Sequence, residues 1–318
     1  MKTQKPYYIT TEKISVGYDG KPLIEEVEIA LRKGEILTLL GPNGAGKSTI
    51  LKSIARQLSL IAGTVRLDGE DMKSLTGAEL SKKMAVVMTK RLRGELMTCE
   101  DVVATGRYPY TGRFGVLRAE DHAAVQNAME LVQVAEIGDS LFDRISDGQR
   151  QRVMLARAIC QEPEILILDE PTAVLTEKEA AALLDSIRGM ASRGIAVIFI
   201  THRLQEVLNV CDKVVIMRDG KVVKDTPASE TSVDEITKCM VGRSVDLSAV
   251  REIRDCSDAR TIMSIRKLWV DMPGEIVRNV NLDVKEGEIL GIGGLAGQGK
   301  LGIPNGVMGL YEAGGTVE

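Results

Sequence analysis

The sequence predicts an α/β protein whose core is a sheet of mostly parallel strands covered by helices. Continuous apolar runs of β-type residues at 36–40, 165–168 and 196–200 alternate with segments of helical period, which is typical of parallel strands buried on both faces. Earlier runs alternate apolar and polar residues, and hairpin-type Asp-Gly pairs stand at 68–69 and 219–220. We therefore expect an antiparallel β subdomain beside a mixed core sheet.

The composition is that of an ordinary globular protein. Of 318 residues, 44% are hydrophobic and 27% are charged, and this length suggests domains of about 150 residues each. The net charge of −4 and the 3% aromatic content argue against a nucleic-acid partner, which needs a basic surface and stacking rings. No apolar run reaches the roughly 18 residues of a membrane span, no signal-peptide core opens the chain, and the five cysteines are scattered. We expect a cytoplasmic protein.

Two features divide the chain. Strand signals disappear between about residues 88 and 145, where an irregular stretch at 94–115 precedes an amphipathic helical pattern at 118–142, so we expect a helical insert. The segment 31–47 recurs as 284–300, which indicates a partial internal repeat. The expected domains are 1–225 with the insert at about 88–145, a linker at 226–260, and a partial, degenerate second copy at 261–318.

The segment GPNGAGKST matches G-x-x-x-x-G-K-[ST] between a buried strand and a helical run, the context of a nucleotide phosphate loop. Its glycines let backbone N–H groups curl around phosphates, and the helix N-terminus adds partial positive charge. We expect Lys47 to reach the β- and γ-phosphates of ATP and the Ser48 hydroxyl to bind Mg²⁺. The predicted binding residues are Gly41, Pro42, Asn43, Gly44, Ala45, Gly46, Lys47, Ser48 and Thr49.

Two carboxylates follow the apolar strand 165–168. Asp169 can hold Mg²⁺ through a water, and Glu170 is placed to orient or deprotonate an attacking water. Taken alone, this pair could equally be the solvated end of a strand.

The segment ISDGQ places Ser146 as the N-cap of a helix and Gly148 where the backbone can approach closely. In isolation it would be read as a capped surface helix.

Together these motifs closely resemble the ATPase cassette of ABC transporters, with every motif in the family's order over residues 8–223. The resemblance implies a P-loop NTPase fold and two cassettes that close head to tail on two ATPs. It further implies that His202 contacts the γ-phosphate and backs Glu170, and that Tyr18 stacks on adenine, although Tyr18 could also be a strand-end core aromatic. The signature that would meet the partner cassette's ATP comprises Ser146, Asp147, Gly148 and Gln149.

The chain also departs from the family pattern. No glutamine stands where the family links Mg²⁺ to the insert, and Thr89 is the nearest aligned position. Asp147 replaces a glycine of the signature. The aspartate loop is replaced by residues 173–176, where Thr176 and Glu179 instead form a T-x-x-E capping box for the next helix.

The second copy of the phosphate loop, GLAGQGKL at 294–301, is incomplete. Leu301 stands where the family has the Ser or Thr that binds Mg²⁺, and leucine cannot ligate a metal. No signature, carboxylate pair or switch histidine follows it. We expect strands such as 288–292 to have the composition of parallel-sheet strands, although the other strands of such a sheet are missing. We also expect this segment to bind no catalytically useful nucleotide.

These features predict an ATP-hydrolysing subunit that energises an ABC importer. LKSIARQL and TGRYPYTGR resemble iron-chelate or cobalamin importer ATPases, whereas the chain from residue 172 through MVGR at 240–243 resembles two-cassette sugar or nucleoside importer ATPases. Because the insert faces the permease, we expect a metal-chelate cargo, with a sugar or nucleoside as the alternative.

The motifs also leave open a soluble ABC ATPase acting on nucleic acid or ribosomes, or an inactive regulatory binder. The resemblance implies that the protein lies at the inner face of the cell membrane. It also implies three partners: integral membrane permease subunits, a second cassette in a homodimer or heterodimer, and indirectly an extracytoplasmic solute-binding protein.

Overall fold

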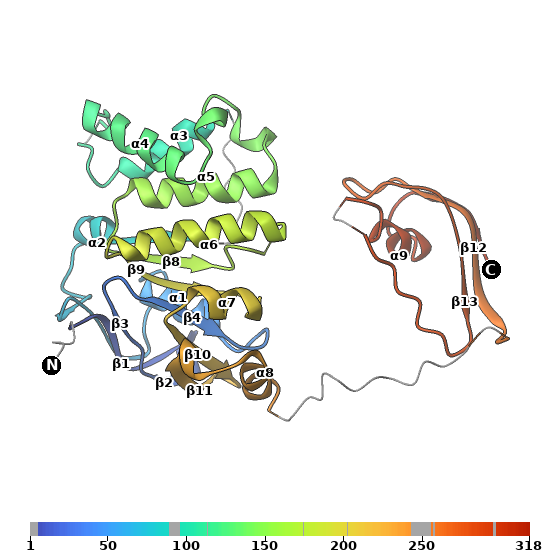
Figure 1. Ribbon diagram of the computed structural model, residues 1–318, viewed down its shortest axis with the longest axis horizontal. Coiled ribbons are helices and arrows are strands. Elements are labelled where there is room, and N and C mark those ends of the chain that lie inside the picture. The colour runs from blue at the N-terminus through green and yellow to red at the C-terminus, as the bar shows by residue number, and fades with distance from the viewer. Residues whose placement is uncertain are drawn as a thin grey trace. The chain divides into compact units, whose positions relative to one another are not determined.

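The computed structural model describes residues 6–88, 96–112, 114–173, 175–201, 203–242, 256, 258–294 and 297–318. The chain forms two compact units, Met1–Val245 and Asp246–Glu318 (Figure 1). Helix α8 (Val233–Val241) lies in the segment expected to be a linker. It packs on α7 (Leu204–Val210) and β10 (Lys213–Arg218) of the first unit and buries Ile236 fully. Within the described residues, no helix combines the length and apolar character that crossing a membrane requires.

The core of the first unit is a six-stranded sheet with the order β11-β10-β4-β9-β8-β7. Strands β10, β4, β9, β8 and β7 run parallel, and β11 pairs antiparallel with β10 at the edge. Every residue of β4, β8 and β9 is buried, which confirms the continuous apolar strands read from the sequence. The strands are β4 (Ile36–Leu40), β7 (Met84–Val87), β8 (Ile165–Asp169), β9 (Ala196–Ile200), β10 (Lys213–Arg218) and β11 (Lys221–Pro227).

An antiparallel sheet forms the subdomain expected beside this core. In it, β1 pairs with β2, β3 and β5. The predicted Asp68-Gly69 turn joins β5 to β6, and both residues have positive φ, 52° and 80°. The alternating residues 27–31 do not form one strand but are divided between the end of β2 and the start of β3. The strands are β1 (Tyr7–Tyr18), β2 (Lys21–Val27), β3 (Ala30–Arg32), β5 (Ala62–Leu67) and β6 (Glu70–Asp71).

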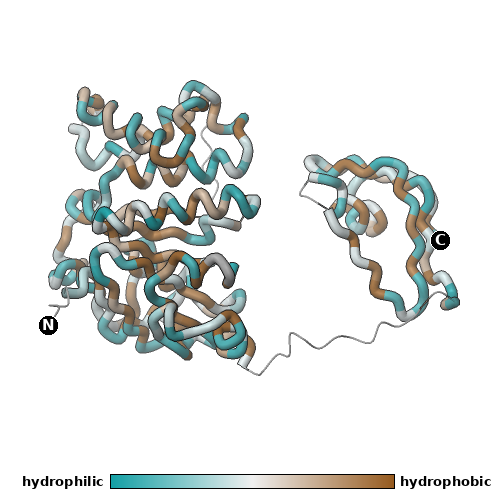
Figure 2. The backbone as a smooth tube through the Cα atoms, viewed as in Figure 1, coloured by the Kyte–Doolittle hydropathy of each residue, from teal (hydrophilic) through white to brown (hydrophobic). Residues whose placement is uncertain are grey.

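The mixed sheet carries a separate hydrophobic core on each face (Figure 2). Leu166 and Leu168 of β8 face the core built with the helical insert and α6, whereas Ile165 and Ile167 face the core shared with α1 and the antiparallel sheet. This alternation is the two-residue period of a strand buried on both sides. The remaining helices outside the insert are α1 (Lys47–Ile54), α2 (Gly77–Lys83), α6 (Glu177–Ser192) and α7 (Leu204–Val210).

The helical insert is more regular than the sequence indicated. The stretch 94–115, expected to be irregular, contains α3, because Thr98 and Asp101 form a capping box that starts a helix. The long helix expected over 118–142 stops early: α4 ends at Leu131, and Gln133 has a φ of 57°. The elements are α3 (Cys99–Ala104), η1 (Thr105–Arg107), α4 (Ala119–Leu131), η2 (Ala135–Ile137), η3 (Phe142–Arg144) and α5 (Asp147–Cys160).

A buried arginine ties this insert together. The Arg107 Nε atom lies 2.8 Å from Asp121 Oδ1 on α4, and its Nη1 atom donates to the Cys160 carbonyl at 2.9 Å and to Glu162 at 2.7 Å. The side chains of Arg107 and Asp121 are only 7% and 4% exposed. Because a buried charge is stable only when it is paired and hydrogen-bonded, this network joins η1, α4 and the end of α5 as one body.

The second unit is a three-stranded antiparallel sheet of order β13-β12-β14 with one short helix. The parallel-type strand expected over 288–292 does not form, since the described strands of this unit offer only antiparallel partners and residues 288–292 are outside any strand. Its small core contains Ile265, Leu268, Val270 and Val277. The elements are β12 (Thr261–Val270), β13 (Val277–Lys285), α9 (Gly302–Val307) and β14 (Ala313–Val317).

Candidate functional site

The predicted phosphate loop joins β4 to α1. Gly44 and Gly46 have φ values of 82° and 92°, in the left-handed region where glycine carries no Cβ penalty. A Cβ on Gly46 would overlap Ile24, and one on Gly41 would overlap the Met217 carbonyl. The glycines therefore let the loop turn tightly against the strands beneath it.

Lys47 lies under this loop and is 8% exposed. Its Nζ atom donates to the carbonyls of Gly41 at 2.7 Å and Pro42 at 2.9 Å. Burial lowers the pKa of Lys47, and the nearby charges of Glu170 and Asp169 oppose that shift. The ammonium group is thus held between its own loop and the two carboxylates that the sequence singled out.

Ser48 and Asp169 meet although they are far apart in the chain. The Ser48 hydroxyl donates to Asp169 Oδ1 at 3.0 Å, and Asp169 is 5% exposed at the end of β8. A hydroxyl and a carboxylate are hard oxygen donors, the set that Mg²⁺ prefers. The side chains present therefore fit the metal that the sequence predicts.

Glu170 follows Asp169 in a left-handed conformation with a φ of 50°. For a residue with a side chain this costs about 1–3 kcal/mol and is typical of functional sites. The Glu170 N–H donates to the Ile200 carbonyl at 3.1 Å, at the end of β9. The conformation thus turns the chain sharply off the sheet while still anchoring it to the neighbouring strand.

Two predicted residues lie outside the described residues: His202, which follows Thr201 at the end of β9, and Thr89, which follows Met88 after β7. Thr201 itself is buried, and its hydroxyl lies 3.4 Å from that of Thr172. This contact joins the segments that follow β8 and β9.

Tyr18 ends β1 beside the loop. Its ring is half-exposed, so it is not a core aromatic, and its hydroxyl lies 3.5 Å from the Thr49 hydroxyl. A cleft of about 760 Å³ opens here, and its lining includes Tyr18, Asp169, Met84 of β7 and Met154 of α5.

The signature residues form the N-terminal end of helix α5. Ser146 Oγ accepts from the Gln149 N–H at 3.2 Å, and Gln149 Oε1 accepts from the Ser146 N–H at 3.0 Å, which confirms the predicted N-cap. Asp147 pairs with Arg150. A Cβ on Gly148 would overlap the Glu179 carboxylate, so the close approach is to α6. Within the described part of the chain, no hydrogen bond joins this turn to residues 41–49.

The predicted T-x-x-E box at the start of α6 is also confirmed. The Thr176 N–H donates to Glu179 at 3.1 Å, and the Glu179 N–H donates back to Thr176 Oγ1 at 3.4 Å. Thr176 therefore caps the start of a helix within the segment where the family often has its aspartate loop.

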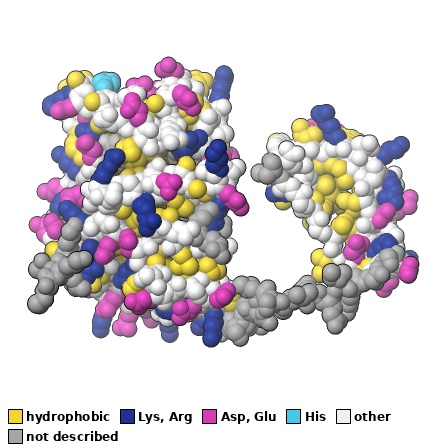
Figure 3. Space-filling model, in the orientation of Figure 1, with side chains coloured by type: hydrophobic (Ala, Val, Ile, Leu, Met, Phe, Trp, Pro, Cys, Tyr) yellow, Lys and Arg dark blue, Asp and Glu magenta, His cyan; other side chains and the backbone are white. Residues whose placement is uncertain are grey.

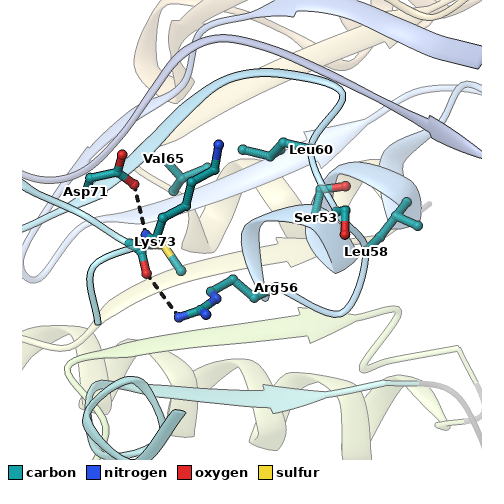
Figure 4. Close-up of a pocket in the computed structure, with 9 residues that line it drawn as sticks. Ser53, Arg56, Leu58, Leu60, Val65, Asp71 and Lys73 are labelled. Carbon is teal, nitrogen blue, oxygen red and sulfur yellow. Dashed lines mark hydrogen bonds between the residues drawn. The ribbon is translucent and has the colours of Figure 1, made fainter. Parts of the chain in front are cut away.

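A smaller hollow of about 290 Å³ lies at the far end of α1 (Figure 4). Arg56 donates to the carbonyls of Met72 at 3.0 Å and Leu75 at 2.7 Å, with a φ of 55° that ends the helix. Arg56 therefore braces α1 from the end opposite the phosphate loop.

Comparison with known proteins identifies the family. The ABC transporter family matches residues 24–173. An uncharacterised ABC transporter ATP-binding protein of Methanocaldococcus jannaschii is 40% identical over 216 residues, which are 68% of this chain and 74% of that protein. The chain belongs to the ABC transporter ATPase family.

Other members of this family match nearly the whole chain. Ribose import ATP-binding proteins of Bacillus cereus and Shouchella clausii are 30% and 31% identical, over 96% and 98% of this chain. The chain spans 61% and 62% of the length of these two relatives.

Solved structures show the cassette fold. A nucleotide-free ATP-binding cassette superposes with a TM-score of 0.66 at 21% identity, covering 77% of this chain and 100% of that cassette. A dimeric cassette bound to ADP and Pi has a TM-score of 0.62 at 22% identity, covering 69% of this chain and 98% of that one. An inward-facing transporter assigned to the metal-chelate type has a TM-score of 0.64 at 22% identity, covering 74% of this chain and 89% of that one.

Arg107, which joins the elements of the insert in this ABC ATPase, was not identified from the sequence. It lies in TGRYPYTGR, read only for its resemblance to chelate importers. No local pattern marks it, because its partners Asp121 and Glu162 lie 14 and 55 positions further along the chain.

Proposed function

We propose that this chain hydrolyses ATP to energise an importer of a ribose-type sugar. The observation that carries the cargo is the match of ribose import ATP-binding proteins to 96–98% of the chain, including its second unit. The metal-chelate cargo expected from the insert is not confirmed, since that likeness is to a structure at 22% identity and extends only to the fold. The comparisons favour the sugar alternative that the C-terminal part of the sequence indicated.

The loop geometry supports a role in binding the triphosphate of ATP. The left-handed φ values of Gly44 and Gly46 turn the loop tightly, which would let backbone N–H groups reach phosphate, and Lys47 supplies a positive charge beside them. Ser48 and Asp169 would hold Mg²⁺, which when bound neutralises phosphate charge. Tyr18, at the cleft mouth beside Thr49, is the candidate for stacking on the base.

Glu170 is the candidate for orienting the attacking water. Its backbone is held in a costly conformation at the edge of the sheet, next to the carboxylate assigned to the metal. A carboxylate there can accept a proton from water as the water attacks phosphorus. In this proposal His202 assists Glu170, and Ser146 and Gly148 face the ATP of a second cassette.

The proposed partners are integral membrane permease subunits, contacted by the helical insert at the inner face of the membrane, and a second cassette. A solute-binding protein outside the membrane would take part indirectly. The insert is suited to transmit motion because the Arg107 network makes it one body. On the face shown in Figure 3, acidic and basic side chains of the first unit are interspersed, which favours this proposal over a nucleic-acid partner.

An uptake experiment tests the proposal. Cells lacking the gene are complemented with the wild-type chain or with Glu170→Gln, and uptake of labelled ribose and of a labelled iron chelate is compared. We expect wild type alone to restore ribose uptake. Restoration of chelate uptake instead would overturn the sugar assignment while leaving the ATPase assignment intact. Normal ribose uptake with Glu170→Gln would remove Glu170 from the chemistry.

A further inference from the structure

The second unit contains a loop with the backbone geometry of the first phosphate loop. Gly297 and Gly299 have φ values of 79° and 85°, close to those of their counterparts Gly44 and Gly46. Lys300 donates to the Gly294 carbonyl at 2.9 Å, as Lys47 does to the first glycine of its own loop. Among the described residues of the second loop, these glycines therefore turn the backbone as Gly44 and Gly46 do, and they leave N–H groups that can hold an anion.

In the second loop, a side chain of the protein already lies at those N–H groups. Glu275 Oε1 accepts from the Gly297 N–H at 2.9 Å, and Oε2 accepts from the Leu301 N–H at 3.4 Å. Glu275 is 7% exposed, although a glutamate in the turn before a strand is normally solvated. Hydrogen bonds from the backbone N–H groups of Gly297, Leu301 and Gly299 and the charge of Lys300 hold the pKa of Glu275 below its ordinary value.

The first loop has no such occupant. Among the described residues, no side chain accepts from the N–H groups of Gly44, Gly46 or Ser48. In the internal repeat, the position of Glu275 falls at Lys21 or Pro22, and neither of these side chains has an acceptor. The two loops share their backbone geometry and differ in whether a carboxylate reaches it.

We propose that the Glu275 carboxylate occupies the anion position of the second loop and thereby keeps nucleotide phosphate out of it. A phosphate would have to displace a negative group from the same N–H donors, and until it did so the two charges would repel. This exclusion is separate from the missing metal hydroxyl at Leu301, because it acts on the phosphate and not on Mg²⁺. Removal of the carboxylate uncovers a latent site for nucleotide phosphate in the second unit.

Nucleotide binding to the full chain tests this exclusion. All variants carry Lys47→Ala to weaken the first loop, and ATP binding is measured by equilibrium dialysis without metal. Amide NMR signals of Gly297 and Gly299 report which loop responds. We expect Glu275→Ala and Glu275→Gln to bind ATP at the second loop about tenfold or more tightly than the parent. The control Glu286→Gln removes the same charge from an exposed position of this unit and should bind as the parent does.

Equal binding by the parent and by folded Glu275 variants would overturn the proposal. A measurement on the unmutated chain guards against a variant that does not fold. The amide signals of Gly297 and Leu301 should titrate together, with a midpoint below the ordinary glutamate value of 4.5. Amide signals that do not move with pH would show that the carboxylate is not bound there. Neither result depends on ATP hydrolysis by the first unit, so failure here and failure of the proposed function are distinguishable.

Discussion

Replacement of Gly46 by alanine should damage the phosphate loop far more than the same change at Gly44. Both residues have left-handed φ values, 92° and 82°. At Gly44 an added Cβ meets nothing within 4 Å, whereas at Gly46 it would overlap Ile24 Cδ1 and lie 2.7 Å from Cγ1. Ile24 is 1% exposed and cannot move aside into solvent.

The magnitude follows from two separable costs. A left-handed alanine costs about 1–2 kcal/mol of folding free energy at either position. Overpacking against a buried side chain adds about 1–3 kcal/mol at Gly46 alone. We therefore expect Gly46→Ala to lower the free energy of unfolding of the first unit by about 2–5 kcal/mol and Gly44→Ala by about 1–2 kcal/mol. The difference between the two variants cancels the change in unfolded-state entropy that both share.

Thermal unfolding followed by circular dichroism measures this difference. For a domain of this size each kcal/mol moves Tm by about 2–4 °C, so Gly46→Ala should melt about 2–12 °C below Gly44→Ala. The chain's single tryptophan, Trp269, lies in the second unit. Its fluorescence transition should not move in either variant. Equal Tm values for the two variants would refute the argument from Ile24.

Three further outcomes are expected. Lys47→Ala should abolish ATP turnover while the fold survives, because the triphosphate loses its charged donor; more than half the wild-type rate in a phosphate-release assay would contradict the loop assignment. Glu170→Gln should keep ATP binding but stall hydrolysis and trap a cassette dimer, visible by size-exclusion chromatography with ATP; normal turnover would exclude its role. Arg107→Met should destabilise the first unit by about 3 kcal/mol or more, since it leaves Asp121 buried and unpaired, whereas the exposed control Arg118→Met should cost about 0–1 kcal/mol. Hydrogen bonds from the Arg118 backbone and the Arg107 side chain hold the pKa of Asp121 below its ordinary 3.8. The stabilisation is therefore complete above about pH 4 and is lost as pH falls through the lowered value. Acid unfolding of Arg107→Met should show a smaller step, since only the hydrogen bond from the Arg118 backbone remains.

Those parts of the fold that depend on local pattern could be predicted from the sequence. Strands β4, β8 and β9 are buried on both faces, so their composition alone identifies them. The end of α1 could not be predicted, because the apolar period continues toward residue 58 while the helix stops at Ile54. Arg56 turns the chain there by bonding to two carbonyls in the segment after β6. That contact joins residues far apart in the sequence, so the spacing of apolar residues along the helix does not reveal it.

In the candidate site too, some features follow from the sequence and others do not. The meeting of Ser48 and Asp169 follows from parallel topology, since both stand at the carboxyl edge of one sheet, after β4 and at the end of β8. The left-handed conformation of Glu170 is not visible in the sequence, because no glycine, asparagine or aspartate marks the position. Two backbone hydrogen bonds hold it, one from its N–H to Ile200 on the neighbouring strand and one to its carbonyl from Ala173.

The two phosphate loops have the same glycine pattern but differ in whether a side chain lies at their N–H groups. Their glycines have nearly the same φ values in both copies, so the loop pattern by itself predicts anion binding twice. What lies at the N–H groups is decided by a residue about twenty positions upstream, which is Glu275 in the second copy and falls at Lys21 or Pro22 in the first. A side chain without an acceptor leaves the donors available to a ligand, and a glutamate supplies an internal anion. Because the loop pattern contains neither residue, a motif match predicts a competent backbone, and only the contacts around it determine whether a nucleotide can use it.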